Sequence, residues 1–511
     1  MWWVFYLVVV TAVTFALFGD TIPYPLVADD YAFVEMGRRS LAEVLGFTRG
    51  HYHYYPLTQF IYYIMYALFG TAPAPYHILV LVLHIINCVL LAMLARAVGR
   101  GRVVALAAAI LFTTSSLTYE VPLWTIGLFS ALSTALYLFA FLAYVQYRRS
   151  RQWRWLVAFV GSFVLAFLSH EQAITLIVGC ALYRVIVEER SINVFRFNWQ
   201  AWLIELGPPA LLLGLFVAAK LFFTQGELFV NRGDIKYTFW SIRISTLQLL
   251  IPNSSLAVAA MFDDVGRPFL ILRLLWWGAL LAGAVWVMVR SGPATSRLLA
   301  GWLLAHVVIV TFAVPLASRH FYLPLVLSTI LVAGVLSDLL GWLLSRLKVL
   351  RPPVQQRMRD FLLLIITLAF AVQGATILIE RKSIWRAAAE QTASIVRVVN
   401  EAYWRHSHCT QLYLVNLPDG LSIPGGDVAY IFRTSAALAL YQAGIPRTVR
   451  ISELHTADAV WNWSVKRGDR RGLVSEAEIG QYACANGTLV MRASPAGDSF
   501  VIEPVKCADV S

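Results

Sequence analysis

The sequence predicts an all-α polytopic membrane protein of about eleven helices, followed by a small α/β domain at the C-terminus. Three observations lead to this fold class. Hydrophobic residues make up 59% of the 511 residues and charged residues only 14%, and the mean hydropathy is +0.67. Several apolar runs approach the roughly 20 residues that a helix needs to cross a bilayer. After residue 380 the hydropathy falls, and short strand-like runs replace the long apolar ones.

The long apolar runs give the order of the predicted spans. Residues 1 to 19 start without a basic segment and end without a small-residue cleavage site, so we interpret them as the first span and not as a signal peptide. The complete set lies near residues 1 to 19, 76 to 96, 103 to 121, 123 to 146, 154 to 169, 172 to 188, 201 to 223, 268 to 289, 298 to 316, 321 to 344 and 361 to 379.

The distribution of basic residues predicts the orientation of these spans. The formal net charge is +12, but Lys and Arg fall mostly in short clusters between apolar runs. This pattern sets membrane topology and does not indicate nucleic-acid binding. With a cytoplasmic N-terminus every cluster lies inside, from Arg96, Arg100 and Arg102 to Arg346, Lys348 and Arg351. We therefore predict a multi-pass protein of the inner (plasma) membrane, with residues 20 to 75, 224 to 267 and 381 to 511 outside the cytoplasm.

One apolar segment of the first external loop is too short to cross the membrane. Residues 57 to 70 (LTQFIYYIMYALFG) are bracketed by Pro56 and by Pro73 and Pro75. We expect a helix that lies in the membrane interface. The alternative is one more helix of the core, because short apolar runs discriminate poorly between the two.

The region from residue 381 to 511 predicts an extracytoplasmic α/β domain. Its expected elements are a helix over 384 to 404, a strand in QLYLVNLP, a turn at Gly425 and Gly426, and a helix near 430 to 443. The runs TLVMRA and SFVIEP flank the turn-forming SPAGD and predict a hairpin.

The five cysteines divide between the spans and this domain. Cys88 and Cys180 fall inside predicted spans, where we expect buried thiols. The hairpin would bring Cys484 next to Cys507, and an external compartment permits a disulfide there. The alternative is that Cys409, which precedes the QLYLV strand, takes one of these two as its partner.

Ionisable residues converge on the outer ends of the predicted spans. Charged groups at a membrane boundary are costly, so their convergence indicates a functional site. An acid pair can supply a base for a hydroxyl, and nearby cations can neutralise a departing phosphate. For Lys220 the alternative is a side chain that reaches the headgroups, and for His77 and His84 it is hydrogen bonding between helices. The converging residues are Asp29, Asp30, His51, His53, His77, His170, Glu171, Lys220, Arg319 and His320.

Four segments in fixed order carry a family resemblance. The acid pair in LVADDYAFVEM is followed by HYYPLTQFIYYIMYALFG, by SHEQAITL and by SRHFYLPLV. In this order they resemble the C-type (GT-C superfamily) membrane glycosyltransferases, within the protein O-mannosyltransferase-like branch, over roughly residues 20 to 330. The resemblance implies a catalytic transmembrane domain over residues 1 to 380, a sugar donor on a polyprenyl phosphate, an external active site, an Asp base, and inversion at the anomeric carbon.

Carried over by position, the resemblance assigns roles to individual residues. Asp29 matches the catalytic Asp, and Asp30 its acidic neighbour. Arg319 and Tyr322 match a segment that faces the donor phosphate.

Two positions depart from the family pattern, and several more residues are expected to contact substrate. His170 stands where a Lys is common, and Tyr55 stands where an Arg usually precedes Pro-Leu. His170 and Lys220 are expected to assist Arg319 at the phosphate, and residues 224 to 267 are expected to cover the site. The further residues expected to contact substrate are His53, Tyr55, Glu171, Arg232, Lys236, Tyr237 and His320.

These expectations define an enzyme and its partners. We expect transfer of a hexose or pentose from a lipid-linked donor, held among membrane lipids, to a hydroxyl of a glycan, lipid or protein. No cofactor is required; a divalent metal is compatible with Asp29 and Asp30, but no separated set of carboxylates demands one. A flippase for lipid-linked sugars would instead carry charges through the bilayer centre and an internal repeat. A non-catalytic anchor would need neither the acid pair nor Arg319.

We predict a cytoplasmic N-terminus and an external C-terminus, because every basic cluster then lies on the cytoplasmic side. Reporters that are active in only one compartment, fused after Ser511, test this orientation. Activity of the cytoplasmic reporter alone would contradict it.

Overall fold

The computed structural model describes most of the chain, with several gaps. The predicted span 268 to 289, the loop 224 to 267, and the residues His53, Arg232, Lys236 and Tyr237 lie outside the described residues. The described residues are 2–46, 55–189, 199–223, 293–311, 318–346, 351–406, 408–423, 427–432, 435–457, 459, 473–496 and 499–506.

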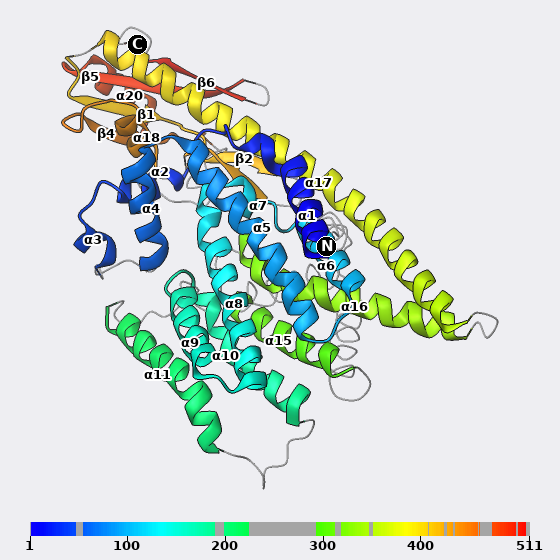
Figure 1. Cartoon of the computed structure of the whole chain (residues 1–511). Helices are drawn as coiled ribbons and strands as arrows, with labels where there is room; N and C mark the ends of the chain where they lie inside the picture. The colour runs from blue at the N-terminus through cyan, green and yellow to red at the C-terminus, as the bar shows by residue number, and fades with distance from the viewer. Residues whose placement is uncertain are drawn as a thin grey trace, which may run out of the picture.

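Helices make up the body of the molecule (Figure 1). Within the described residues, five helical segments are long and apolar enough to cross a membrane. They contain α1 (Trp2–Phe18), α5 (Pro73–Ala97), α8 (Leu128–Ser150), α16 (Tyr322–Ser345) and α17 (Pro352–Arg405). The other apolar helices are α6 (Arg102–Thr113), α9 (Trp153–Phe167), α10 (Thr175–Leu182) with the π-helical η4 (Tyr183–Glu189), α11 (Trp199–Phe223) and α15 (Ala294–Thr311). Every predicted span within the described residues thus overlaps with helix over much of its length, while the number of crossings stays a prediction.

One predicted span is shorter than expected. The sequence predicts helix over 103 to 121, but α6 ends at Thr113, and turns lead to the short helix α7 (Glu120–Leu123). Hydroxyl side chains explain the early end, because they compete locally for backbone groups. Thr114 donates to the carbonyl of Ile110 at 2.8 Å, and the amide of Leu117 donates to Ser115 Oγ at 3.2 Å.

The core of the bundle forms where α5, α6, α8 and α16 pack against one another. Alanines from Ala105 to Ala109 on α6 are buried, and their small side chains let neighbouring helices approach closely. Arg100, which follows α5, donates to Asp338 of α16 at 2.8 Å and to Ser296 of α15 at 2.6 Å. A Cβ at Gly334 would lie 2.8 Å from the Arg100 guanidinium, so a side chain there would displace the guanidinium from its present position.

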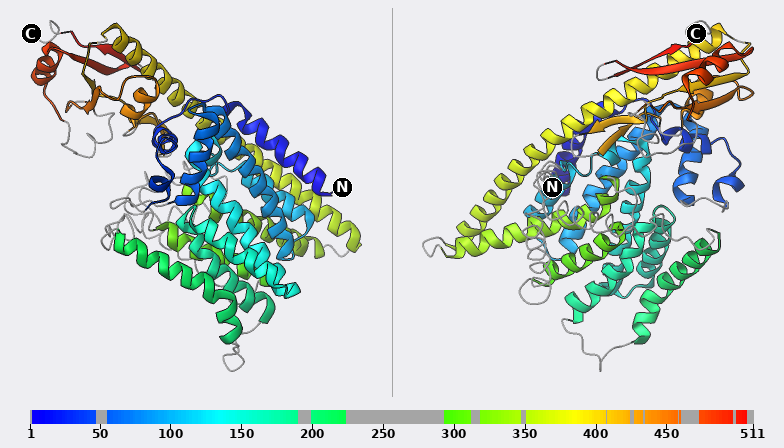
Figure 2. Two further views of the ribbon diagram at one scale, coloured as in Figure 1. Left: turned by 60° about the vertical axis from the view of Figure 1, so that its left-hand side comes forward. Right: turned by 180° about the vertical axis from the view of Figure 1, so that it is seen from behind.

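Three short helices follow α1 and lie near the C-terminal strands (Figure 2). They are α2 (Asp30–Met36), α3 (Leu41–Leu45) and α4 (Pro56–Phe69). On α4, Thr58 and Tyr62 are buried, whereas Leu68 and Phe69 are exposed. Helix α4 thus leaves part of its apolar surface exposed. This favours the prediction of a helix in the membrane interface over the alternative of a core helix.

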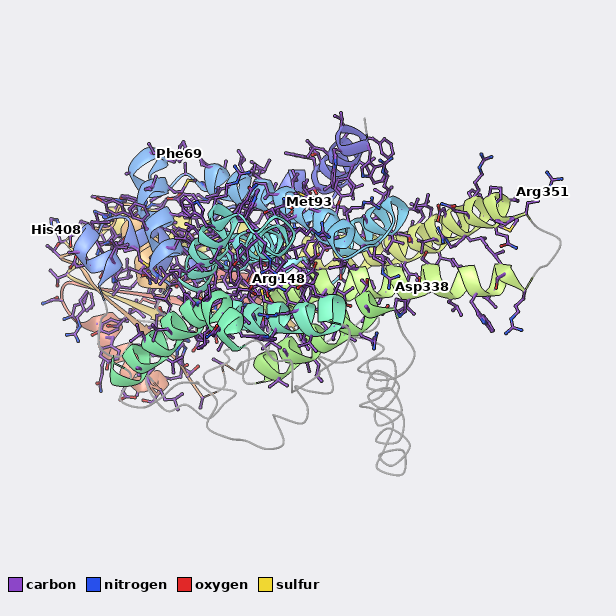
Figure 3. All side chains as sticks on the ribbon, turned by 60° about the horizontal axis from the view of Figure 1, so that its bottom comes forward. Phe69, Met93, Arg148, Asp338, Arg351 and His408 are labelled. Carbon is purple, nitrogen blue, oxygen red and sulfur yellow. The ribbon has the colours of Figure 1, made fainter. Side chains whose placement is uncertain are left out.

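Helix α17 joins the bundle to the C-terminal strands without interruption. It has 54 residues and is therefore about 80 Å long. Arg351 and His408, which flank it, lie at opposite ends of the molecule (Figure 3). Its first half packs against α6 and α16, and its second half against the strands. The expected helix over 384 to 404 is thus the second half of α17, and the predicted domain boundary at residue 380 falls inside a continuous helix.

Residues 408–506 form what we call the sheet region. The order of its main sheet is β4-β1-β5-β6, in which β1 is parallel to β4 and β5, and β6 is antiparallel to β5. The hairpin of TLVMRA and SFVIEP is thereby confirmed. The strands are β1 (Gln411–Val415), β4 (Arg450–Leu454), β5 (Thr488–Ala496) and β6 (Ser499–Pro504), with β2 (Gly420–Ile423) and β3 (Asp427–Tyr430) as a separate pair. The helices are α18 (Ala436–Gln442) and α20 (Glu476–Cys484).

Two expectations about the sheet region change. The helix predicted near 430 to 443 starts only at Ala436, because Val428 and Tyr430 belong to β3 and pair with β2. Cys409 has a free thiol, so the alternative in which it forms the disulfide is wrong. Cys484 is disulfide-bonded; its predicted partner Cys507 lies outside the described residues, and the pairing stays a prediction.

Candidate active site

The acid pair lies at the start of α2, directly after a strained residue. Ala28 is buried and has φ 44°, a left-handed conformation that is unusual for a residue with a side chain. Its amide donates to the carbonyl of Ile431, in the sheet region, at 2.8 Å. The backbone that presents Asp29 and Asp30 is therefore held by a partner far away in the sequence.

The two carboxylates of the pair occupy different environments. Asp30 is buried and accepts hydrogen bonds from the amide of Val27 at 3.0 Å and from the hydroxyl of Thr125. Burial raises the pKa of Asp30 to about 7, against the lowering effect of these hydrogen bonds. Asp30 thus fastens α2 to η2 (Thr125–Gly127), whereas Asp29 is only half-buried. Of the two predicted catalytic acids, Asp29 is the one that a substrate can reach.

Arg319 is held by a buried carboxylate. It lies in η8 (Ser318–Phe321), where Glu120 accepts from its guanidinium and, at 2.8 Å, from its backbone amide. The guanidinium lies over the ring of Trp124, 5.2 Å from the ring centre. It also interacts electrostatically with Asp29. The fold therefore brings Asp29 and Arg319 to one place, as the sequence predicts.

A second predicted group adjoins this pair. The ring of Tyr55 stacks on His170 with ring centres 5.4 Å apart, and Tyr55 hydrogen-bonds Glu171. Burial and the charge of Glu171 raise the pKa of Tyr55, which therefore stays protonated. Tyr55 also lies near Arg319. The predicted residues Tyr55, His170 and Glu171 thus belong to the same site.

The backbone next to His170 determines which tautomer its neutral ring adopts. The amide of Gln172 donates to His170 Nδ1 at 3.3 Å. Nδ1 is therefore an acceptor, so the neutral ring carries its proton on Nε2 and can donate from there. The side chain of Gln172 donates to the carbonyl of His320 at 3.1 Å and joins this segment to η8.

One predicted phosphate ligand, Tyr322, contacts α5 instead. Tyr322 begins α16, and its hydroxyl points into the bundle, 2.8 Å from His84 Nδ1 and 3.2 Å from the side-chain nitrogen of Asn87. Tyr322 and His84 therefore pack α16 against α5, in line with the alternative reading of His84. Lys220 lies on α11, but its side chain is outside the described part of the chain.

Sequence reasoning missed several residues of the site. Glu120, Trp124 and Thr125 follow α6, and Tyr430 comes from the sheet region. A signal existed for Glu120, which is the lone carboxylate at the end of an apolar run and therefore a candidate by default. Tyr430 carried no signal, because only the folded chain brings it near Arg319. Within the described ranges, no group of three or more His, Cys, Asp or Glu side chains could hold a metal.

Comparisons with known proteins agree with this architecture. No family model matches the sequence. The chain is 27% identical over 299 residues to protein O-mannosyl-transferase Tmtc1 of Drosophila melanogaster, which covers 52% of this chain; the chain spans 35% of that relative's length.

Solved structures show a similar fold at low sequence identity. ArnT from Cupriavidus metallidurans in the apo state superposes with a TM-score of 0.51 at 13% identity, over 100% of this chain and 99% of that one. ArnT bound to undecaprenyl phosphate gives 0.43 at 13% identity, over 96% and 92%. An Archaeoglobus fulgidus oligosaccharyltransferase gives 0.49 at 12% identity, over 100% and 74%.

We predict that Asp30 makes the protein less stable as the pH rises from about 4 to about 7. The pKa of Asp30 is about 7 in the folded chain, whereas an unfolded aspartate titrates near ~4. Between these values the folded state binds the proton more strongly, so raising the pH lowers the free energy of unfolding. Thermal unfolding of the detergent-purified protein measures this loss.

The loss should be smaller in Asp30→Asn than in the wild type. Part of it should remain, because burial and Asp419 also raise the pKa of Glu453 to about 7. Asp360→Asn, which changes a carboxylate at the start of α17, is the control and should keep the wild-type profile. Identical pH profiles of wild type and Asp30→Asn would contradict the assignment.

Proposed function

We propose that this multi-pass membrane protein, which has the GT-C fold and resembles protein O-mannosyltransferases in sequence, is a glycosyltransferase. It moves a sugar from a polyprenyl-phosphate donor to an acceptor hydroxyl, on the extracytoplasmic face. The observation that carries this proposal is the meeting of a half-buried carboxylate, Asp29, with a guanidinium, Arg319, that is itself fixed by buried Glu120.

Asp29 is the general base of the proposed reaction. It is nearer to solvent than Asp30, and it interacts electrostatically with Arg319. As the acceptor hydroxyl attacks the anomeric carbon, its proton passes to Asp29. Attack from the face opposite the phosphate is a single displacement and inverts the configuration at that carbon. Asp30 acts only by holding the start of α2.

Arg319 stabilises the departing lipid phosphate. A guanidinium has five N–H donors in a rigid fork that matches phosphate oxygens. Glu120 accepts from one guanidinium nitrogen and from the backbone amide, which orients the group without using all of its donors. His170 can add a neutral donor from Nε2, and Lys220 stays a proposed contributor. The donor class agrees with ArnT, whose fold this chain shares and which has been solved with undecaprenyl phosphate.

The two rival functions explain less of this geometry. A transporter for lipid-linked sugars has no use for an orienting carboxylate buried behind one arginine. A membrane anchor for the sheet region does not account for the left-handed Ala28 or for the strained presentation of Asp29, because such strain persists mainly where function needs it.

Asp29→Asn should abolish most turnover and leave donor binding intact. The amide keeps the shape of the side chain but cannot accept the proton, and loss of a general base typically costs about 10²- to 10⁴-fold in rate. Purified variants are assayed with a panel of polyprenyl-phosphate sugars and with extracts of cell-surface glycans as acceptors. Asp360→Asn is the matched control. Wild-type turnover by Asp29→Asn, or loss in Asp30→Asn alone, would remove Asp29 from this role.

Arg319→Ala should weaken donor binding and turnover, and Arg319→Lys should restore them only in part, because an ammonium lacks the planar fork. Binding of undecaprenyl phosphate to the purified protein measures the first effect. Arg386→Ala is the control, since Arg386 is a more exposed arginine on α17 that pairs with Asp20. Unchanged affinity in Arg319→Ala would show that the side chain only reaches toward lipid headgroups.

A further inference from the structure

Three aromatic rings pack together where the helical bundle meets the sheet region; we call this contact the seam. Trp124 follows α7, Trp385 lies in the middle of α17, and Tyr430 ends β3. The ring centres of Trp124 and Trp385 are 5.3 Å apart, and those of Trp124 and Tyr430 are 5.4 Å apart. Both tryptophans are almost fully buried, so the cluster is packed as tightly as a protein core.

This cluster reaches the cation of the site. Trp124 is the ring over which the Arg319 guanidinium lies, at 5.2 Å. Tyr430 packs against the same ring and lies near Arg319. A change in the position of Tyr430 therefore moves the surface on which Arg319 rests.

The next residue of the same strand end reaches the acid pair. The carbonyl of Ile431 accepts from the amide of Ala28 at 2.8 Å, immediately before Asp29. Ile431 is fixed in turn, because its amide donates to the carbonyl of Asp419 at 2.8 Å. Two consecutive residues of the sheet region, Tyr430 and Ile431, thus contact both halves of the site.

Further contacts hold the sheet region against α2. The side chain of Gln442 donates to the carbonyl of Tyr31 at 2.9 Å, and Arg447 pairs with Glu35. These contacts lie on the helix whose first turn carries Asp30. The contacts between the sheet region and the bundle therefore run without a break from α18 to the acid pair.

We infer that Tyr430 is a positioning residue through which the sheet region completes the active site. It holds Arg319, by way of Trp124, in the orientation that meets the donor phosphate, while the Ile431 carbonyl holds the backbone that presents Asp29. The part that concerns the donor rests on the proposed function; the part that concerns the position of Arg319 does not.

The test compares variants of Tyr430 in the purified full-length protein. Tyr430→Ala removes the ring, Tyr430→Leu keeps volume but not aromaticity, and Tyr430→Phe keeps the ring without the hydroxyl. Tyr413→Ala is the matched control, because Tyr413 is also a tyrosine of the sheet region that packs on an aromatic ring, Tyr482 at 4.5 Å, but in a cluster separate from the one that holds Trp124.

The first measurement is the affinity for undecaprenyl phosphate. We expect Tyr430→Ala and Tyr430→Leu to weaken it about 5- to 50-fold, the range typical of coupled neighbours, and Tyr430→Phe to retain it. In an Arg319→Ala background Tyr430→Ala should cause no further loss, because it acts through Arg319. Equal losses in both backgrounds, or the same loss in Tyr413→Ala, would overturn the inference.

The second measurement needs no donor. Phenylglyoxal modifies arginine side chains, and peptide mapping reports the rate at Arg319. We expect faster modification in Tyr430→Ala and Tyr430→Leu, and the wild-type rate in Tyr430→Phe and Tyr413→Ala, at an unchanged melting temperature. An unchanged rate in Tyr430→Ala and Tyr430→Leu would refute the positioning role. If instead the wild type fails to bind undecaprenyl phosphate while the modification rates change as expected, the proposed donor is wrong and the inference stands.

Discussion

The buried carboxylate of Glu120 is the constraint on which the arrangement of the site depends. A charge enclosed in a low-dielectric interior is stable only with a partner that satisfies it, and here the partner is Arg319, through both its guanidinium and its amide. This requirement draws the start of η8 toward α7. The ion pair fixes the guanidinium, and with it the distances from the guanidinium to Asp29 and to the ring of Trp124.

Burial also separates the roles of two adjacent acids. Asp29 and Asp30 are identical in chemistry, but only Asp30 is enclosed and used to bind Val27 and Thr125. The left-handed backbone conformation of one residue, Ala28, directs the two acids to different environments. In the proposed reaction a single dipeptide thus supplies one group that holds the structure and one that accepts the proton.

The sequence was sufficient for features that depend on local composition. Apolar runs located the helices, the alternation in TLVMRA and SFVIEP located the hairpin, and the order of motifs placed Asp29 with Arg319. It was insufficient where contacts between distant segments decide the outcome. Tyr322 follows Arg319 closely, yet the helical turn directs its hydroxyl to His84. Tyr430 joins the site only because β3 is paired with β2 and packed against α17. Periodicity does not encode such encounters.

The length of α17 has a mechanical consequence. A helix that continues without a break from the bundle into the sheet region acts as a stiff rod, and a tilt at one end is carried to the other. Helices adjust their tilt to the thickness of the surrounding bilayer at a modest cost per ångström of mismatch. Trp385 lies on this helix and touches Trp124. A tilt of α17 therefore changes how the sheet region packs against the bundle. In this way the lipid composition of the membrane, through its thickness, affects the fit between the bundle and the sheet region.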